Sequence, residues 1–138
     1  MSSATRPPRH GSHAAVLYVD DERPNRLVFE YLFGSEFKVL TVDSGEDALA
    51  ALEREHVGVL VTDQRMPVMT GNELLMEVRE RWPEIVRIVV TAYSDHKPIL
   101  QAVNAGLVSR YIVKPWERDE LADVLRWAME VHIVGQRD

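Results

Sequence analysis

Short runs of branched apolar residues alternate along the chain with segments in which apolar positions recur about every 3.6 residues. Each apolar run is short enough to form one strand and rich enough in Val and Ile to be buried. In chain order the runs are AAVLYV, KVLTV, VGVLVT, VRIVVT and RYIV. The pattern therefore predicts five strands.

The segments between these runs carry helix start and stop signals. Pro24 opens the first segment, and Ser44 and Asp47 form a cap pattern at the start of the second. The predicted helices cover residues 24–33, 44–55, 71–81, 95–105 and about 117–133. Strands that alternate with helices favour a parallel sheet with helices on both faces, so we predict a five-strand, five-helix α/β sandwich.

Residues 1–13 contain almost nothing that could be buried, and they are predicted to form a disordered tail. A single folded domain is expected at 14–133. Residues 134–138 are expected to be the end of this domain or the start of a linker, although Gly135 favours a helix end.

Composition narrows the functional classes. The chain has 138 residues, enough for one core, and a net charge of -6, which disfavours direct nucleic-acid binding. No apolar run approaches the roughly 20 residues that a membrane span needs, and the N-terminus lacks a secretory pattern. We therefore expect a cytoplasmic protein that contacts neither nucleic acid nor membrane.

Polar residues end four of the five apolar runs. Asp20 and Asp21 follow the first, Asp63 the third, Thr91 ends the fourth and Lys114 follows the fifth. Ligands of open parallel α/β sheets bind beyond the carboxyl ends of the strands, so we expect these side chains to converge on one rim.

Three carboxylates held together repel one another unless a cation lies among them. Mg²⁺ suits such a site, because it binds a few carboxylates and leaves positions for water and phosphate oxygens. The ammonium and the hydroxyl could contact an incoming phosphoryl group, which leaves one carboxylate free to attack it. The rim therefore predicts formation of an aspartyl phosphate at Asp63.

The ordered motifs resemble the receiver domain of bacterial two-component response regulators over about residues 14–133. The matches are the acidic pair "DD", Asp63 followed by "RMP" and Gly71, "TA" at Thr91, and "KP" at Lys114. The resemblance implies a flavodoxin-like fold with strand order 2-1-3-4-5 in three α/β/α layers.

The same resemblance implies roles for the acids. Asp63 would accept a phosphoryl group from a histidine kinase or a histidine phosphotransfer protein. Asp21 and Asp63 would bind Mg²⁺ together with the backbone carbonyl of Arg65, and Asp20 would act directly or through water.

Further residues match the family as contacts of the phosphoryl group or as parts of its switch. Lys114 would contact the phosphoryl group, and Thr91 would swing towards it. Tyr111 matches an aromatic residue that changes rotamer, Ala92 is small beside the site, and Pro115 would follow a cis peptide bond.

Arg65 and Tyr93 occupy positions that tune the lifetime of the phosphate in this family. Both are large here, and the hypothesis is that they screen the acyl phosphate from water. By resemblance, the fourth helix, fifth strand and fifth helix, roughly residues 95–133, would form the switched surface. A downstream partner, a fused effector domain or a second copy of the chain would dock there.

Two other functions remain open alternatives. One is a constitutive interaction module that keeps the fold without using phosphate, although such modules usually lack one of the acids, the Thr or the Lys. The other is a phosphatase with an Asp nucleophile, but that family places a second Asp where this chain has Arg65. The preferred interpretation is a signalling switch that catalyses only its own phosphorylation and dephosphorylation.

Overall fold

A computed structural model describes residues 14–92 and 96–136 of the chain. The predicted tail at 1–13 and the candidate site residue Tyr93 lie outside the described residues.

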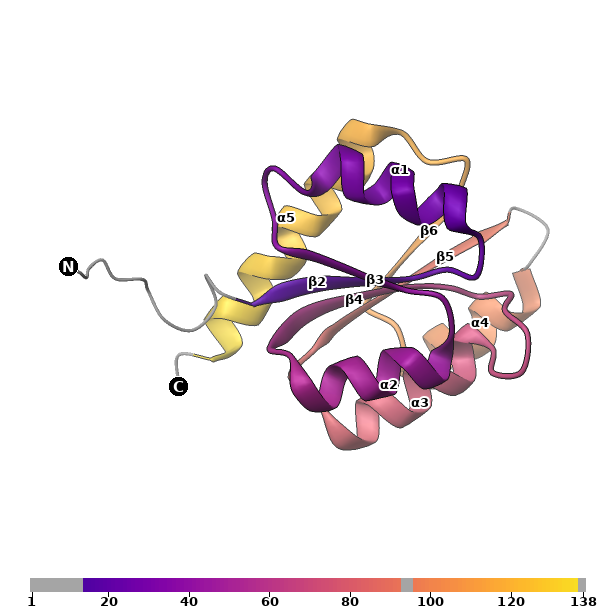
Figure 1. Ribbon diagram of the computed structural model, residues 1–138. Coiled ribbons are helices and arrows are strands. Elements are labelled where there is room, and N and C mark those ends of the chain that lie inside the picture. Colours follow the sequence, from indigo (N-terminus) through magenta and orange to yellow (C-terminus); the bar gives the residue numbers. More distant parts are fainter. Residues whose placement is uncertain (1–13, 93–95, 137–138) are drawn as a thin grey trace.

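The described residues form a three-layer α/β/α sandwich around a parallel sheet (Figure 1). The strands are β2 (Ala15–Val19), β3 (Val39–Val42), β4 (Val57–Asp63), β5 (Val86–Ala92) and β6 (Arg110–Lys114). Their order in the sheet is β3-β2-β4-β5-β6, and each neighbouring pair runs parallel. This is the order 2-1-3-4-5 that the resemblance implied, so that prediction is confirmed.

The helices divide between the two faces of the sheet. They are α1 (Arg23–Phe33), α2 (Gly45–Arg54), α3 (Gly71–Arg81), α4 (His96–Asn104) and α5 (Arg118–Gly135). Figure 1 shows α1 and α5 on one face and α2, α3 and α4 on the other. The last helix continues two residues beyond the predicted end at 133, through Gly135.

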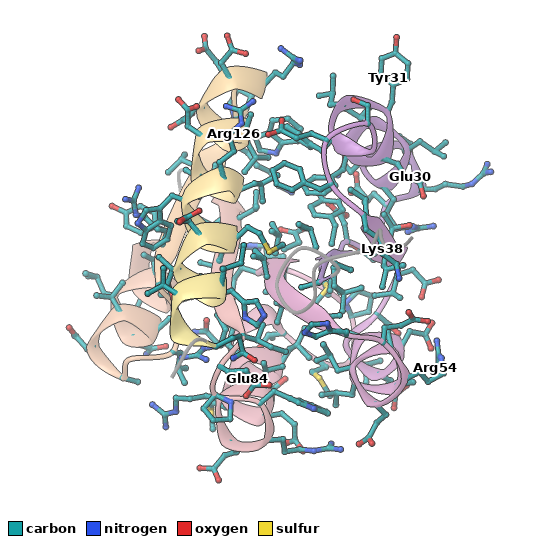
Figure 2. All side chains as sticks on the ribbon, turned by 90° about the vertical axis from the view of Figure 1, so that its left-hand side faces the viewer. Glu30, Tyr31, Lys38, Arg54, Glu84 and Arg126 are labelled. Atoms are coloured by element: carbon teal, nitrogen blue, oxygen red, sulfur yellow. The ribbon has the colours of Figure 1, made fainter. Side chains whose placement is uncertain are left out.

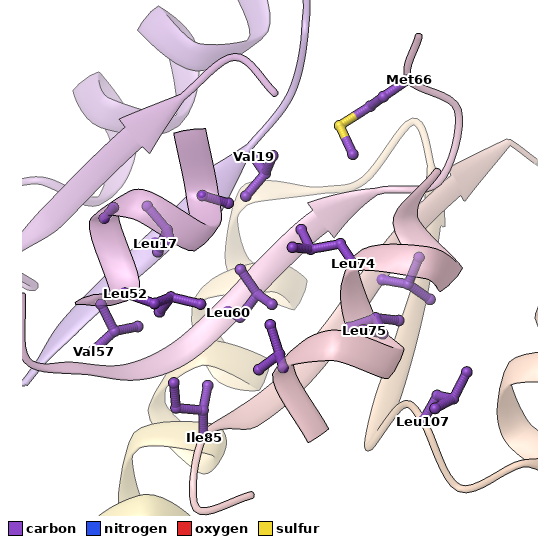
Figure 3. Packing of buried hydrophobic residues seen from close by; sticks show 14 of the residues in the cluster. Leu17, Val19, Leu52, Val57, Leu60, Met66, Leu74, Leu75, Ile85 and Leu107 are labelled. Carbon is purple, nitrogen blue, oxygen red and sulfur yellow. The ribbon is translucent and has the colours of Figure 1, made fainter. Parts of the chain in front are cut away.

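Alternation along β2 builds both halves of the core, because successive strand residues point to opposite faces. Leu17 and Val19 lie in the cluster that includes Leu74 of α3 (Figure 3). Val16 and Tyr18 lie in the cluster under α1 and α5. With both faces covered, this interior strand is fully buried.

Side-chain caps fix where two of the helices begin. The hydroxyl of Ser44 accepts a hydrogen bond from the backbone N–H of Asp47, which confirms the predicted cap of α2. Thr70 and Glu73 form a reciprocal capping box at the start of α3. This second cap holds α3 directly after the loop that follows Asp63.

A long-range ion pair joins α5 to the segment between α1 and β3. Arg126 of α5 donates from Nε and Nη2 to the carboxylate of Glu36, at 2.6 and 2.9 Å. Figure 2 shows Arg126 on the part of α5 that lies near α1, whereas the side chain of Tyr31 projects outward from α1.

Among the described helices, none has the length and apolar content needed to cross a membrane.

Candidate functional site

The register of the strands brings the predicted polar residues to one edge of the sheet. Asp63 at the end of β4 pairs with Val90 of β5, and Ala92 at the end of β5 pairs with Lys114 of β6. Val19 pairs with Thr62, so Asp20 emerges beside Asp63. The expected convergence of the strand ends is therefore present in the structure.

Three carboxylates gather at this edge. One carboxylate oxygen from each of Asp20, Asp21 and Asp63 lies within 4.8 Å of the other two. Asp20 and Asp63 are buried, and Asp21 is exposed. Burial raises the pKa of Asp63 above its ordinary value, with a further rise from the charge of Asp20 and an opposing effect from Lys114.

Lys114 forms the positive side of the site. Its Nζ lies 3.2 Å from Oδ2 of Asp63, and the lysine side chain stays about one-third exposed. The ammonium therefore neutralises part of the buried charge and can still move towards an incoming anion.

The neighbouring candidate residues lie at the same edge or just beside it. Thr91 is buried and donates its hydroxyl to the carbonyl of Ala92 at 3.3 Å, a contact that a better acceptor could replace. Ala92 is exposed, and the Lys114-Pro115 peptide bond is cis, as the resemblance implied. Tyr111 is half-exposed on β6 and is therefore not part of the buried core.

Two residues that sequence reasoning missed hold Asp20 in place. The hydroxyl of Tyr18 donates to Oδ2 of Asp20 at 2.7 Å, and the side-chain amide of Asn25 donates to the same oxygen at 3.1 Å. The backbone N–H of Glu22 donates to Oδ1 at 2.9 Å. The available signal for Tyr18 was its spacing, since strand residues two apart share a face.

Burial and the adjacent carboxylate keep the Tyr18 hydroxyl protonated. Burial raises its pKa well above the ordinary tyrosine value, and the hydrogen bond to Asp20 raises it further. Tyr18 therefore remains a hydrogen-bond donor to the acid at neutral pH.

The loop after Asp63 is shaped by a close backbone approach. A Cβ at Gly71 would lie 2.7 Å from the carbonyl oxygen of Asp63 and 2.9 Å from Cα of Gln64, so no larger residue fits without a shift. Arg65 is exposed in this loop, and Val68 has a φ of 72°. Gly71 thus brings the start of α3 against the backbone that carries Asp63.

A groove of about 600 Å³ opens between α1 and the segment after β6. Val28, Leu32 and Trp116 supply its apolar lining, and Lys114 and Arg118 supply its charge. Because Lys114 also contacts Asp63, the groove reaches the edge of the acidic cluster.

The donor set fits a hard divalent cation. Oxygen ligands from three carboxylates can come within range of one ion, and the burial of two of them makes their uncompensated charge unfavourable. A bound Mg²⁺ would offset the negative charge of the cluster and so oppose the rise in the pKa of Asp63.

Comparisons with known proteins match nearly the whole described chain. The family model described as response regulator receiver domain matches residues 16–126. The hydrogenase transcriptional regulatory protein HoxA of Cupriavidus necator is 50% identical over 117 residues, which cover 85% of this chain and 24% of that protein. The response regulator protein FleR of Pseudomonas aeruginosa is 36% identical over 126 residues, 89% of this chain and 25% of that protein.

The fold is similarly matched among solved structures. An uncharacterized protein from Neptuniibacter caesariensis superposes with a TM-score of 0.87 at 32% identity, covering 91% of this chain and 93% of that one. The chain spans about a quarter of the length of HoxA and FleR, so the likeness to these two regulators concerns only one part of each.

Proposed function

The chain belongs to the family of response regulator receiver domains, and from that premise we propose that Asp63 accepts a phosphoryl group beside a bound Mg²⁺. Receiver domains are components of two-component signalling and not conventional enzymes. The observation that carries the proposal is the ion pair between Lys114 and Asp63 at the edge of the three-carboxylate cluster.

The proposed reaction is an in-line transfer to a carboxylate. An oxygen of Asp63 attacks the phosphorus of a phosphohistidine on a histidine kinase or histidine phosphotransfer protein. The new O–P bond forms as the P–N bond breaks, and the imidazole leaves with the electron pair. Burial raises the pKa of Asp63 and Lys114 opposes that rise, so the lysine favours the ionised carboxylate that attacks.

The chain's own residues would receive the transferred charge. Lys114, now 3.2 Å from Asp63, would pair with a phosphoryl oxygen, and the Thr91 hydroxyl would donate to another. Asp20, Asp21 and Asp63, with the backbone carbonyl of Arg65, would hold the metal. When bound, Mg²⁺ would offset negative charge on the phosphoryl oxygens.

A surface that we call the switch face supports a role in partner control. It is defined by exposed apolar residues on α4, β6 and α5: Leu100, Val103, Tyr111, Trp127 and Val131. Phosphorylation adds negative charge and acceptor oxygens at the adjacent rim, which can favour one arrangement of Thr91 and Tyr111 over another. We propose that a partner or a second copy of the chain docks on this face.

The groove beside Lys114 supports a docking site for the phosphodonor that is separate from the switch face. Lys114 both lines this groove and contacts the acceptor carboxylate, so a donor protein resting there would have its phosphohistidine near Asp63.

The wider protein is also a matter of proposal. Relatives named as transcriptional regulatory proteins support a downstream partner or fused effector domain under control of this receiver. We keep the receiver domain at 14–133, a tail at 1–13, and residues 134–138 as the domain end or the start of a linker. We propose a cytoplasmic location, and the net charge of -6 disfavours direct nucleic-acid contact.

Intact-mass analysis after incubation with Mg²⁺ and acetyl phosphate tests the proposal. We expect one added phosphoryl group in the wild type, and no addition in Asp63→Ala or when the metal is chelated. A time course on Arg65→Ala tests whether this side chain protects the phosphate, in which case the variant loses it faster.

A wild-type adduct that persists in Asp63→Ala would overturn the assignment of the acceptor. Absence of both an adduct and Mg²⁺ binding in the wild type would instead favour the constitutive interaction module. Turnover of a phosphate ester without self-labelling would favour the phosphatase.

A further inference from the structure

Tyr18 is a buried tyrosine in the middle of the sheet, directed at the acidic cluster. Its side chain is 1% exposed, and its ring stacks on Phe29 with centroids 4.1 Å apart and planes within 4°. Phe29 in turn contacts Phe33. This close packing fixes the ring, and with it the position of the hydroxyl.

The hydroxyl completes a set of donors around one carboxylate. An ionised carboxylate offers about four acceptor sites, two on each oxygen. Oδ2 of Asp20 accepts from Tyr18 and from Asn25, which uses both of its sites. Oδ1 accepts from the backbone N–H of Glu22, which leaves one site on that oxygen.

We propose that Tyr18 is a positioning residue for the metal site. Tyr18 holds Asp20 so that this carboxylate can give the metal only one bond, from Oδ1, either directly or through water. The inference rests on the proposed function, because it assumes that the three-carboxylate cluster binds Mg²⁺. It extends that function by naming the residue that selects the oxygen and the number of bonds that Asp20 supplies.

The restriction matters for the choice of ion. Mg²⁺ requires nearly octahedral geometry and few protein ligands, whereas Ca²⁺ accepts more oxygens and two-oxygen binding by one carboxylate. An Asp20 limited to one bond therefore favours Mg²⁺ and leaves room for water and phosphoryl oxygens. Release of Oδ2 would allow Asp20 to rotate and bind through both oxygens.

The test is the affinity of Tyr18→Phe for Mg²⁺ and Ca²⁺, measured by titration calorimetry in the absence of any phosphodonor. The substitution keeps the ring and its stack on Phe29 but removes the hydroxyl. We expect Mg²⁺ affinity to fall about 10–100-fold, the usual effect of losing a partner of a metal ligand. Ca²⁺ affinity should fall less, so the preference for Mg²⁺ over Ca²⁺ decreases.

Two further variants separate positioning from general loss of packing. Asn25→Ala removes the other donor to Oδ2 and should shift the ion preference in the same direction. Phe33→Leu disturbs the same aromatic cluster without touching Asp20, so it should lower the melting temperature and leave the ratio of the two affinities unchanged.

The outcomes are distinguishable. Wild type that binds Mg²⁺ while Tyr18→Phe keeps the same affinities and ion preference would overturn the positioning role and leave the proposed function standing. An equal loss of both ions in Tyr18→Phe and Phe33→Leu would assign Tyr18 to packing alone. Wild type that binds no Mg²⁺ would overturn the metal site and the inference with it.

Discussion

Asp63 has two opposing neighbours, and their balance sets its response to pH. Burial and the charge of Asp20 raise its pKa, and Lys114 lowers it, with a net rise. Between about pH 3.9, the ordinary Asp pKa, and the raised pKa of Asp63 in the folded state, the folded protein therefore binds more protons than the unfolded chain. Stability falls through that window as the pH rises, because ionised Asp63 is less favourable in the folded state.

This sign predicts the behaviour of Asp63→Asn without metal. At pH 7 the variant should melt at a higher temperature than the wild type, because the amide has no charge to bury. The difference should shrink as the pH falls towards about 3.9 and be small below it, where wild-type Asp63 is largely protonated in both states. Thermal unfolding followed by circular dichroism at several pH values measures it.

Added Mg²⁺ supplies the control for this prediction. The ion should raise the melting temperature of the wild type at pH 7, because a ligand that binds only the folded state stabilises that state. Its effect on Asp63→Asn should be much smaller, because the variant lacks one of the three carboxylates. A variant that is less stable than wild type at pH 7 would contradict the sign.

At the scale of elements, the start of α3 depends on a glycine for space. The Cβ of Gly71→Ala would meet backbone atoms of Asp63 and Gln64 at 2.7 and 2.9 Å, and backbone cannot move aside as a flexible side chain can. We expect a loss of about 1–3 kcal/mol in the free energy of unfolding, the usual range for overpacking. Phosphorylation should slow as well, since the displaced backbone carries the acceptor.

Gly135→Ala is the matched control for this substitution. Apart from its chain neighbours and the backbone of its own helix, no atom lies within 4 Å of a Cβ at that position in the last turn of α5, and alanine favours helix more than glycine does. Chemical denaturation should therefore show unchanged or slightly higher stability. Equal losses in the two variants would mean that the contact at Gly71 is not the cause.

At the scale of the whole molecule, the switch face predicts phosphorylation-dependent association. Sedimentation velocity should show the phosphorylated wild type forming a dimer that the unphosphorylated protein does not form. Val103→Glu places a charge among the exposed apolar residues of α4, so it should weaken the dimer at least about tenfold.

Tyr31→Glu provides the comparison, because Tyr31 is 86% exposed on α1, away from the switch face (Figure 2). It should leave dimerisation unchanged. A phosphorylated wild type that stays monomeric would remove the second copy as the occupant of this face, and equal weakening by both variants would show that the dimer uses another surface.

The sequence by itself determined the elements and the kind of chemistry. Apolar runs and helical periodicity gave the five strands and five helices, because burial imposes those periods locally. Acids placed directly after strands pointed to one rim, since parallel strands end on the same edge. The cap at Ser44 was also readable, because its two partners are three residues apart.

Only the tertiary structure decided which side chains touch. The pair of Arg126 with Glu36 joins residues far apart in the chain, and so does the contact between the rings of His56 and His132. The hydrogen bond from Tyr18 to Asp20 depends on packing under α1 that fixes the tyrosine ring. Local periodicity carries no record of such contacts, because their distances are set by how the layers pack on one another.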